Sequence, residues 1–135
     1  MNVREVMSTD VACANCGDTL QSAAQQMAEI NIGSLPVKDG ERLVGIVTDR
    51  DIVLRAVAKG YSPDQPVEDA MTDRLVTVAP DASLEEAARV MSEKQIRRLY
   101  VTDGDRLAGV ISLGDLAVEA RGEQAGEALT EISKA

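Results

Sequence analysis

The chain has 135 residues and a formal net charge of −9, and 44% of its residues are hydrophobic. This length accommodates one compact domain, or two small halves that share a core. The acidic charge and the scarcity of aromatic residues, two Tyr and no Phe or Trp, argue against general binding to nucleic acids or anionic membranes. Because no long apolar run or signal-peptide pattern is present, we expect a cytoplasmic protein.

The sequence contains an internal repeat. A constant shift of 64 residues aligns residues 3–56 with residues 67–120 without a gap. Identical residues recur along the whole alignment, and the pairs include Met27 and Met91, Gly45 and Gly109, and Asp51 and Asp115. An ungapped match of this extent indicates a duplicated structural unit.

Each copy predicts the element order β-α-β-β-α, and hence an α+β fold. In the first copy we expect a strand at 10–14, a helix at about 19–31, strands at 35–37 and 43–47, and a helix from Thr48 to about Ala58. The turn between the two middle strands contains Asp39-Gly40, a strong hairpin signal. The second copy predicts a strand at 74–78 and a helix at 83–95, where Ser83 and Glu86 have the pattern of a full capping box.

Turn-forming residues separate the two copies. Residues 60–66 carry Gly, Ser, Asp and two Pro, which are typical of a linker. We therefore predict domains at 1–60 and 67–121, joined by a linker at 61–66. Residues 122–135 predict a short C-terminal helix that docks or dimerises, because their apolar residues fall on one helical face.

The last helix of each copy begins with a hydroxyl, two further residues and an aspartate. These pairs are Thr48 with Asp51 and Ser112 with Asp115. One interpretation is a capping box, in which hydroxyl and carboxylate satisfy backbone N–H groups at the helix start. A single motif of this kind does not distinguish capping from ligand binding.

The chain resembles a tandem pair of CBS domains, a Bateman module, over residues 3 to about 121. The resemblance rests on three features that occur once in each copy: VREVM and VEDAM at the start, GSLPV and RRLYV in the middle, and the hydroxyl-x-x-Asp motif at the end. Among CBS proteins it is most similar to the small stand-alone bacterial members. The resemblance implies two repeats related by pseudo-twofold symmetry, with clefts that bind AMP, ADP or ATP, or in some members S-adenosylmethionine. It also implies a homodimer, here through the helices at 19–31 and 83–95.

The resemblance gives the helix starts a second role, compatible with capping. It assigns ribose binding to Asp51 and Asp115, and a helix N-terminus with free N–H groups, such as the one after Thr48, is a natural seat for a phosphate. By the same resemblance, aliphatic residues line the adenine slot: Val11, Ala12 and Ile32 in one copy, and Leu75, Val76 and Ile96 in the other. These six residues equally fit an ordinary core.

The basic residues do not repeat. Arg50 corresponds to Gly114, and Arg97 and Arg98 correspond to Gly33 and Ser34. In related CBS pairs, basic residues on the middle strand of one repeat reach the phosphates held by the other. If this holds here, all three arginines serve the Thr48 cleft, which then dominates polyphosphate binding. Solvated surface arginines are the alternative, and Tyr100, where the first copy has Pro36, changes the shape nearby.

Cys13 and Cys16 form a C-x-x-C motif without a counterpart in the second copy. The chain has no His and no other Cys, so it offers two strong zinc ligands where a structural site needs four, and we expect no metal site within one chain. Reduced thiols, a reversible disulfide and a metal shared between two chains stay open.

The sequence offers no set of nucleophile, base and orienting group, so we expect a protein that is not an enzyme. The first hypothesis is a regulatory module that senses adenine nucleotides and acts on a partner protein through a change of shape or assembly. The alternative is a non-catalytic structural or interaction protein with vestigial clefts, responsive to redox state or metal through Cys13 and Cys16.

Overall fold

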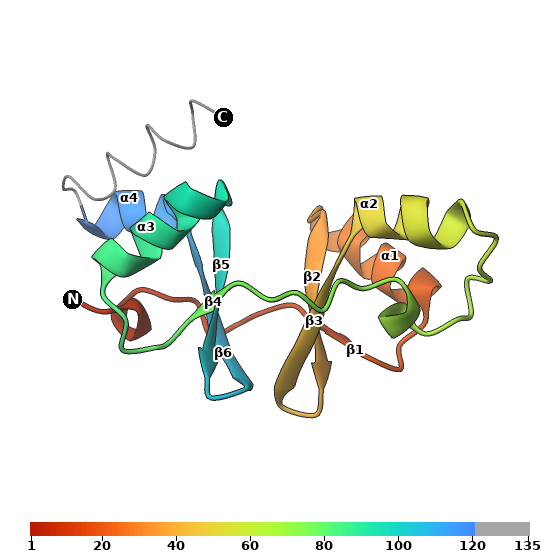
Figure 1. The fold of residues 1–135 in the computed structure, drawn as a ribbon, viewed down its shortest axis with the longest axis horizontal. Coiled ribbons are helices and arrows are strands. Elements are labelled where there is room, and N and C mark those ends of the chain that lie inside the picture. The colour runs from red at the N-terminus through yellow and green to blue at the C-terminus, as the bar shows by residue number, and fades with distance from the viewer. Residues whose placement is uncertain (121–135) are drawn as a thin grey trace. The chain divides into compact units, whose positions relative to one another are not determined.

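The computed structural model describes residues 1–120, and the predicted C-terminal helix lies outside the described residues. The chain divides into two compact units. The central unit is Ala12–Leu75, and the terminal unit combines Met1–Val11 with the chain from Val76 onward. Both units mix helices and strands in the same order, which confirms the predicted α+β fold and the duplication (Figure 1). No helix within residues 1–120 is both long and apolar enough to cross a membrane.

The central unit has three strands with its helices on one face (Figure 1). Strand β1 (Ala14–Asn15) is parallel to β2 (Ser34–Asp39), and β2 is antiparallel to β3 (Arg42–Thr48). Helix α1 (Leu20–Ile30) connects β1 to β2. After β3 comes one α-helical turn, α2 (Asp49–Asp51), and then the π-helix η2 (Ile52–Val57). The helix predicted from after Thr48 to about Ala58 is thus present as far as Val57, although only its first turn is α-helical.

Local side-chain chemistry sets the ends of α1. Thr19 Oγ1 accepts a hydrogen bond from Ser22 N at 3.0 Å, which begins the helix. Asn31 adopts a left-handed conformation, with φ of 56°, and ends it. Between these caps, apolar residues recur on one face of α1, and Leu20, Ala23 and Met27 are buried there. They belong to the same buried cluster as Leu35 and Val37 of β2 and Val47 of β3.

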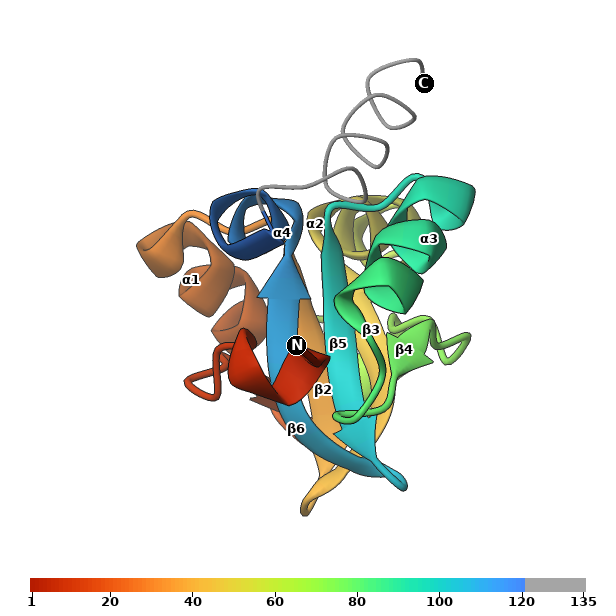
Figure 2. The same cartoon turned by 90° about the vertical axis from the view of Figure 1, so that its left-hand side faces the viewer.

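The terminal unit repeats this arrangement (Figure 2). Its strands are β4 (Thr77–Val78), β5 (Arg98–Asp103) and β6 (Arg106–Ser112), and its helices are α3 (Leu84–Lys94) and α4 (Leu113–Ala120). Ser83 Oγ accepts from Glu86 N at 3.0 Å. The reciprocal half of the predicted capping box does not form, and the Glu86 carboxylate instead lies 3.6 Å from Arg89 Nη2.

The two hairpins share a backbone irregularity. The β2–β3 register shifts after Val37, which pairs with Gly45, and the β5–β6 register shifts after Val101, which pairs with Gly109. The duplication therefore extends to the position of the bulge. The first strand of each copy, predicted at 10–14 and 74–78, is only two residues long, because it pairs with its neighbour at two positions.

Each unit is completed by the segment that begins the other sequence repeat. In the terminal unit, the short helix η1 (Val3–Glu5) buries Val3 fully, and Val3 N donates to Ala82 O at 2.9 Å. In the central unit, η3 (Val67–Asp69) buries Val67, whose N–H donates to Asp18 O at 2.7 Å. The boundaries of the compact units, at residues 11/12 and 75/76, therefore differ from those of the sequence repeats, 3–56 and 67–120. The domain boundaries 1–60 and 67–121 stay a prediction.

Glycine permits the incoming segment to approach the strand closely. Ile46 and Thr72 exchange two backbone hydrogen bonds of 2.8 Å beside Gly45. A Cβ at Gly45 would lie 2.6 Å from Met71 Sδ and 2.9 Å from Thr72 O. Gly109 meets Met7 and Ser8 in the same way in the terminal unit, so both copies require glycine at this position.

We predict that Gly45→Ala lowers the free energy of unfolding by about 1–3 kcal/mol, because the added methyl group overlaps a backbone carbonyl that is held in the strand pairing. Gly17→Ala is the matched control, since nothing lies within 4 Å of its added Cβ. Urea denaturation of both variants and the parent protein measures the difference. Equal stability of the two variants would contradict the close approach at Gly45.

Candidate functional site

The hydroxyl and the aspartate at the start of each final helix bind each other's backbone. Asp51 N donates to Thr48 Oγ1, and Thr48 N donates to Asp51 Oδ2, both at 3.0 Å. Asp115 N donates to Ser112 Oγ at 3.0 Å, and Ser112 N donates to Asp115 Oδ2 at 2.9 Å. The capping-box interpretation is confirmed in both copies. Because each bond to a carboxylate uses only Oδ2, the other oxygen of each aspartate has acceptor capacity left.

The two helix starts differ in how their N–H groups are used. In α2, Asp49 N donates to Gly33 O at 2.9 Å, Arg50 N donates to Asp49 Oδ1 at 2.7 Å, and Asp51 N is held by Thr48. The expectation of free N–H groups after Thr48 is therefore not met. The cause is Asp49, whose carboxylate takes one of these donors. Its counterpart at the start of α4 is Leu113, which has no carboxylate.

Asp51 also faces a guanidinium group. Its side chain is only 15% exposed, and Oδ1 lies 3.9 Å from Arg55 Nε. Arg55 Nη1 donates to Met71 O and to Thr72 Oγ1, both at 3.2 Å. Sequence reasoning missed Arg55. The signal was available, since Arg55 is the residue one helical turn after the motif aspartate and its counterpart is Glu119.

The six residues predicted to line the adenine slot are divided between the units. Ala12, Ile32 and Leu75 belong to the central unit, and Val11, Val76 and Ile96 belong to the terminal unit. None of them is fully buried: Leu75 is exposed and the other five are half-buried. Ala12, Val76 and Ile96 pack against the core while keeping part of their surface open. A wall of a ligand site needs this combination of support and exposure.

The three predicted phosphate-binding arginines are exposed and have no ion pair among the residues of the described part of the chain. Arg50 is in α2 of the central unit. Arg97 and Arg98 lie next to the start of α4, since Arg97 O accepts from Leu113 N at 2.9 Å and Arg98 pairs with Ser112 across the hairpin. That these three residues serve the same phosphate-binding cleft stays a prediction, because it joins residues of the two units.

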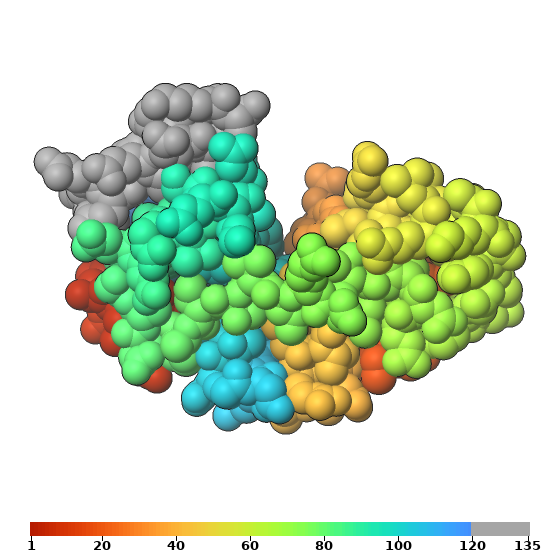
Figure 3. All heavy atoms as spheres, in the orientation of Figure 1, coloured from red at the N-terminus to blue at the C-terminus, as the bar shows by residue number. Residues whose placement is uncertain are grey.

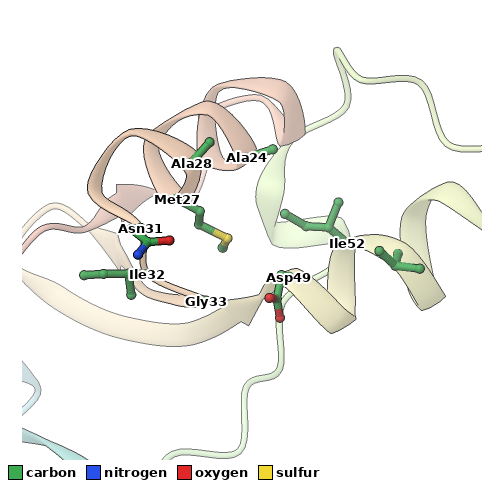
Figure 4. A pocket seen from close by; sticks show the side chains of 9 residues that line it. Ala24, Met27, Ala28, Asn31, Ile32, Gly33, Asp49 and Ile52 are labelled. Carbon is green, nitrogen blue, oxygen red and sulfur yellow. The ribbon is translucent and has the colours of Figure 1, made fainter.

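A pocket of about 380 Å³ lies between α1 and the start of α2 in the central unit (Figure 4). Its lining is mostly apolar, and includes Met27, Ile32 and Ile52, with the side chains of Asn31 and Asp49 as polar groups. The counterparts of Asp49 and Ile52 in the terminal unit are Leu113 and Leu116, which are buried. The sequence patterns did not predict this pocket. The difference that indicates it is Asp49 in the first copy, where the second copy has Leu113.

The helices expected to dimerise use their apolar faces within the units. Leu84, Ala87 and Met91 of α3 are buried against β5 and β6, as the matching residues of α1 are against their own strands. The homodimer through these helices stays a prediction. Apolar residues that are exposed in the central unit are Ile30 at the end of α1, and Val53, Leu54 and Val57 in η2. Figure 3 shows the η2 segment, in yellow, on the surface of the molecule.

Cys13 and Cys16 are free and half-buried, one on each side of β1. With an extended strand between them, their Cα atoms are about 10 Å apart, which exceeds the reach of a disulfide. An intrachain disulfide would therefore require β1 to leave the sheet. Within residues 1–120, no three Cys, Asp or Glu side chains gather into a possible metal site.

The comparisons with known proteins agree with this geometry. The family model described as CBS domain matches residues 3–57 and 67–122. The CBS domain-containing protein YhcV of Bacillus subtilis is 44% identical over 133 residues, which cover 98% of this chain and 95% of that protein.

Two solved structures are also similar. The crystal structure of Hypoxic Response Protein I with two coordinated zinc ions has a TM-score of 0.76 and 36% identity, and covers 88% of this chain and 98% of that one. The crystal structure of CBSX2 in complex with AMP has a TM-score of 0.75 and 28% identity, and covers 89% of this chain and 96% of that one.

Proposed function

Because the chain belongs to the CBS-domain family as a tandem pair, we propose that it is a regulatory module that binds an adenine nucleotide: AMP, ADP or ATP. CBS-domain proteins are typically regulatory and non-catalytic. The observation that carries the proposal is the pair of helix starts, where Asp51 and Asp115 each keep one carboxylate oxygen outside the capping box. The AMP complex of CBSX2 supports the choice of ligand class.

The proposed roles follow from the chemistry of each group. Asp51 and Asp115 accept hydrogen bonds from ribose hydroxyls, which are donors suited to a carboxylate. Arg50, Arg97 and Arg98 bind phosphate, because a guanidinium group stays charged and offers several donors. The half-buried aliphatic residues hold adenine, and Thr48 and Ser112 keep the two aspartates in place.

Nucleotide binding regulates by changing the assembly of the module or its interaction with a partner protein. We propose a homodimer that uses the exposed apolar residues of η2, because exposed apolar groups favour association. The module itself carries out no chemical step, in keeping with its family. Its location in the cytoplasm stays a prediction.

A second candidate function rests on the two thiols. Cys13 and Cys16 are free and partly exposed, and the similar Hypoxic Response Protein I holds two zinc ions. Two such pairs from two chains supply the four ligands of a structural zinc site. In this case the clefts are vestigial and zinc controls the assembly.

A thermal-shift experiment separates the two candidates. A ligand that binds only the folded protein raises its apparent stability by mass action. We expect AMP, ADP or ATP at millimolar concentration to raise the melting temperature, with S-adenosylmethionine and NAD as comparison ligands. A shift with zinc alone, lost in the double variant Cys13→Ser and Cys16→Ser, would favour the second candidate and contradict the first.

We predict that Asp51→Ala weakens binding of the nucleotide that gives the largest shift by roughly ten- to a hundredfold, since one or two charge-assisted hydrogen bonds are lost. Calorimetric titration measures the change. Asp103→Ala is the matched control, because it removes an exposed carboxylate from the end of strand β5. Unchanged affinity in a folded Asp51→Ala protein would leave Asp51 with a capping role only.

A second variant tests the arginines. Replacing Arg97 and Arg98 by the Gly and Ser of the first copy should weaken ATP binding by at least about tenfold, because charge-assisted contacts to phosphate are lost. Adenosine has no phosphate, so its affinity should stay within about twofold of the parent value. Titrations of both ligands against both proteins provide the check. Equal losses for ATP and adenosine would exclude a phosphate-binding role for these arginines.

A further inference from the structure

We propose that Arg55 is a positioning residue that makes Asp51 the ribose-binding carboxylate of the module and gives it a preference for ribonucleotides over deoxyribonucleotides. The inference rests on the proposed function and narrows it to one of the two aspartates. It concerns a residue that binds no ligand itself and acts through Asp51.

The two oxygens of Asp51 have different partners. Oδ2 accepts from Thr48 N at 3.0 Å, and Oδ1 lies 3.9 Å from Arg55 Nε. The longer distance is that of an ion pair without a short hydrogen bond, so Oδ1 keeps its capacity to accept from a hydroxyl. Arg55 thus restricts the carboxylate without occupying the oxygen that a ribose needs.

The guanidinium group of Arg55 also forms hydrogen bonds with the segment that pairs with β3. Nη1 donates to Met71 O and Thr72 Oγ1, both at 3.2 Å. Thr72 is held by its two 2.8 Å backbone hydrogen bonds to Ile46 in β3, the strand that ends at Thr48. A closed set of contacts therefore connects the end of β3, the carboxylate and the incoming segment, with a hydrogen bond to Oδ2 and an ion pair at Oδ1.

The local helix geometry separates the two copies at this position. Arg55 lies in the π-helix η2, which follows directly after Asp51, whereas α4 is α-helical throughout Leu113–Ala120. Single π-helical turns occur frequently at functional sites. Here the π-helical turn carries the side chain that contacts both Asp51 and the segment at Met71.

The terminal unit has the same capping box without this support. The counterpart of Arg55 is Glu119, one helical turn after Asp115. A carboxylate has no N–H group to donate to Met7 O, the counterpart of Met71 O, and its charge repels both Asp115 and a nucleotide phosphate. Asp115 is therefore capped in the same way as Asp51, but no ion pair with its second oxygen is present among residues 1–120.

The test compares ATP, 2′-deoxyATP and 3′-deoxyATP by calorimetric titration. We expect the parent protein to prefer ATP by about tenfold or more, because the deoxy ligands lack a hydroxyl that donates to Asp51. Arg55→Met should reduce this preference to within about twofold by weakening ATP binding alone, and Arg55→Lys, which keeps the charge, should restore part of it. A purely structural role would weaken all three ligands by the same factor.

Two further variants complete the design. Glu119→Gln is the matched control at the same position of the second copy, and it should keep the parent preference. Asp51→Asn, which still offers an oxygen to Thr48 N, should remove the preference entirely. Circular dichroism verifies that each variant is folded.

The measured nucleotide preferences support or overturn the role of Arg55 as follows. A parent preference that survives Arg55→Met, or that persists in Asp51→Asn, overturns it and leaves nucleotide binding intact as the proposed function. An equal loss for all three ligands in Arg55→Met also overturns it. If the parent protein binds none of ATP, ADP and AMP at millimolar concentration, the proposed function fails and the inference fails with it.

Discussion

The close backbone approach at Gly45 and Gly109 is the constraint on which the rest of the structure depends. A strand can hold a neighbouring segment this near only where no side chain intervenes, and both copies place glycine there. The approaching segment always comes from the start of the other repeat, so neither unit has its full core without it. Val3 and Val67, both fully buried, show that these segments fill core positions.

The close approach at Gly45 also affects the candidate site. The segment that Gly45 admits carries Met71 and Thr72, and these residues anchor Arg55, which faces Asp51. Packing and ligand chemistry therefore share one set of contacts in the central unit. The terminal unit keeps the glycine and the capping box but has Glu119 in place of Arg55. The duplicated units thus share the same backbone arrangement, while Arg55 against Glu119, together with Asp49 against Leu113 and Arg50 against Gly114, gives the two carboxylates different electrostatic surroundings.

The sequence predicted the parts of the fold that local chemistry determines. The two hairpins and the capping boxes at Thr48 and Ser112 follow from short-range patterns, and the structure has them; of the capping box predicted at Ser83, it has only the hydroxyl half. The sequence predicted a helix after Thr48 but did not predict that Ile52–Val57 is π-helical, because π-helical turns are rare and apolar periodicity predicts an α-helix. It missed the contact of Arg55 with Thr72, which joins residues far apart in the chain. The hydrogen bond from Arg50 N to the Asp49 carboxylate was missed because the motif at this helix start was read from Thr48 and Asp51 alone.

The proposed nucleotide site depends on one atomic contact, between a ribose hydroxyl and Asp51. A crystal structure of the protein with bound ATP tests it most directly. We expect a ribose hydroxyl oxygen within about 2.6–3.2 Å of Asp51 Oδ1, while Oδ2 still accepts from Thr48 N and Arg55 stays on Met71 O. A nucleotide whose ribose lies away from Asp51, or an Asp51 that leaves Thr48 to reach the ligand, would contradict it.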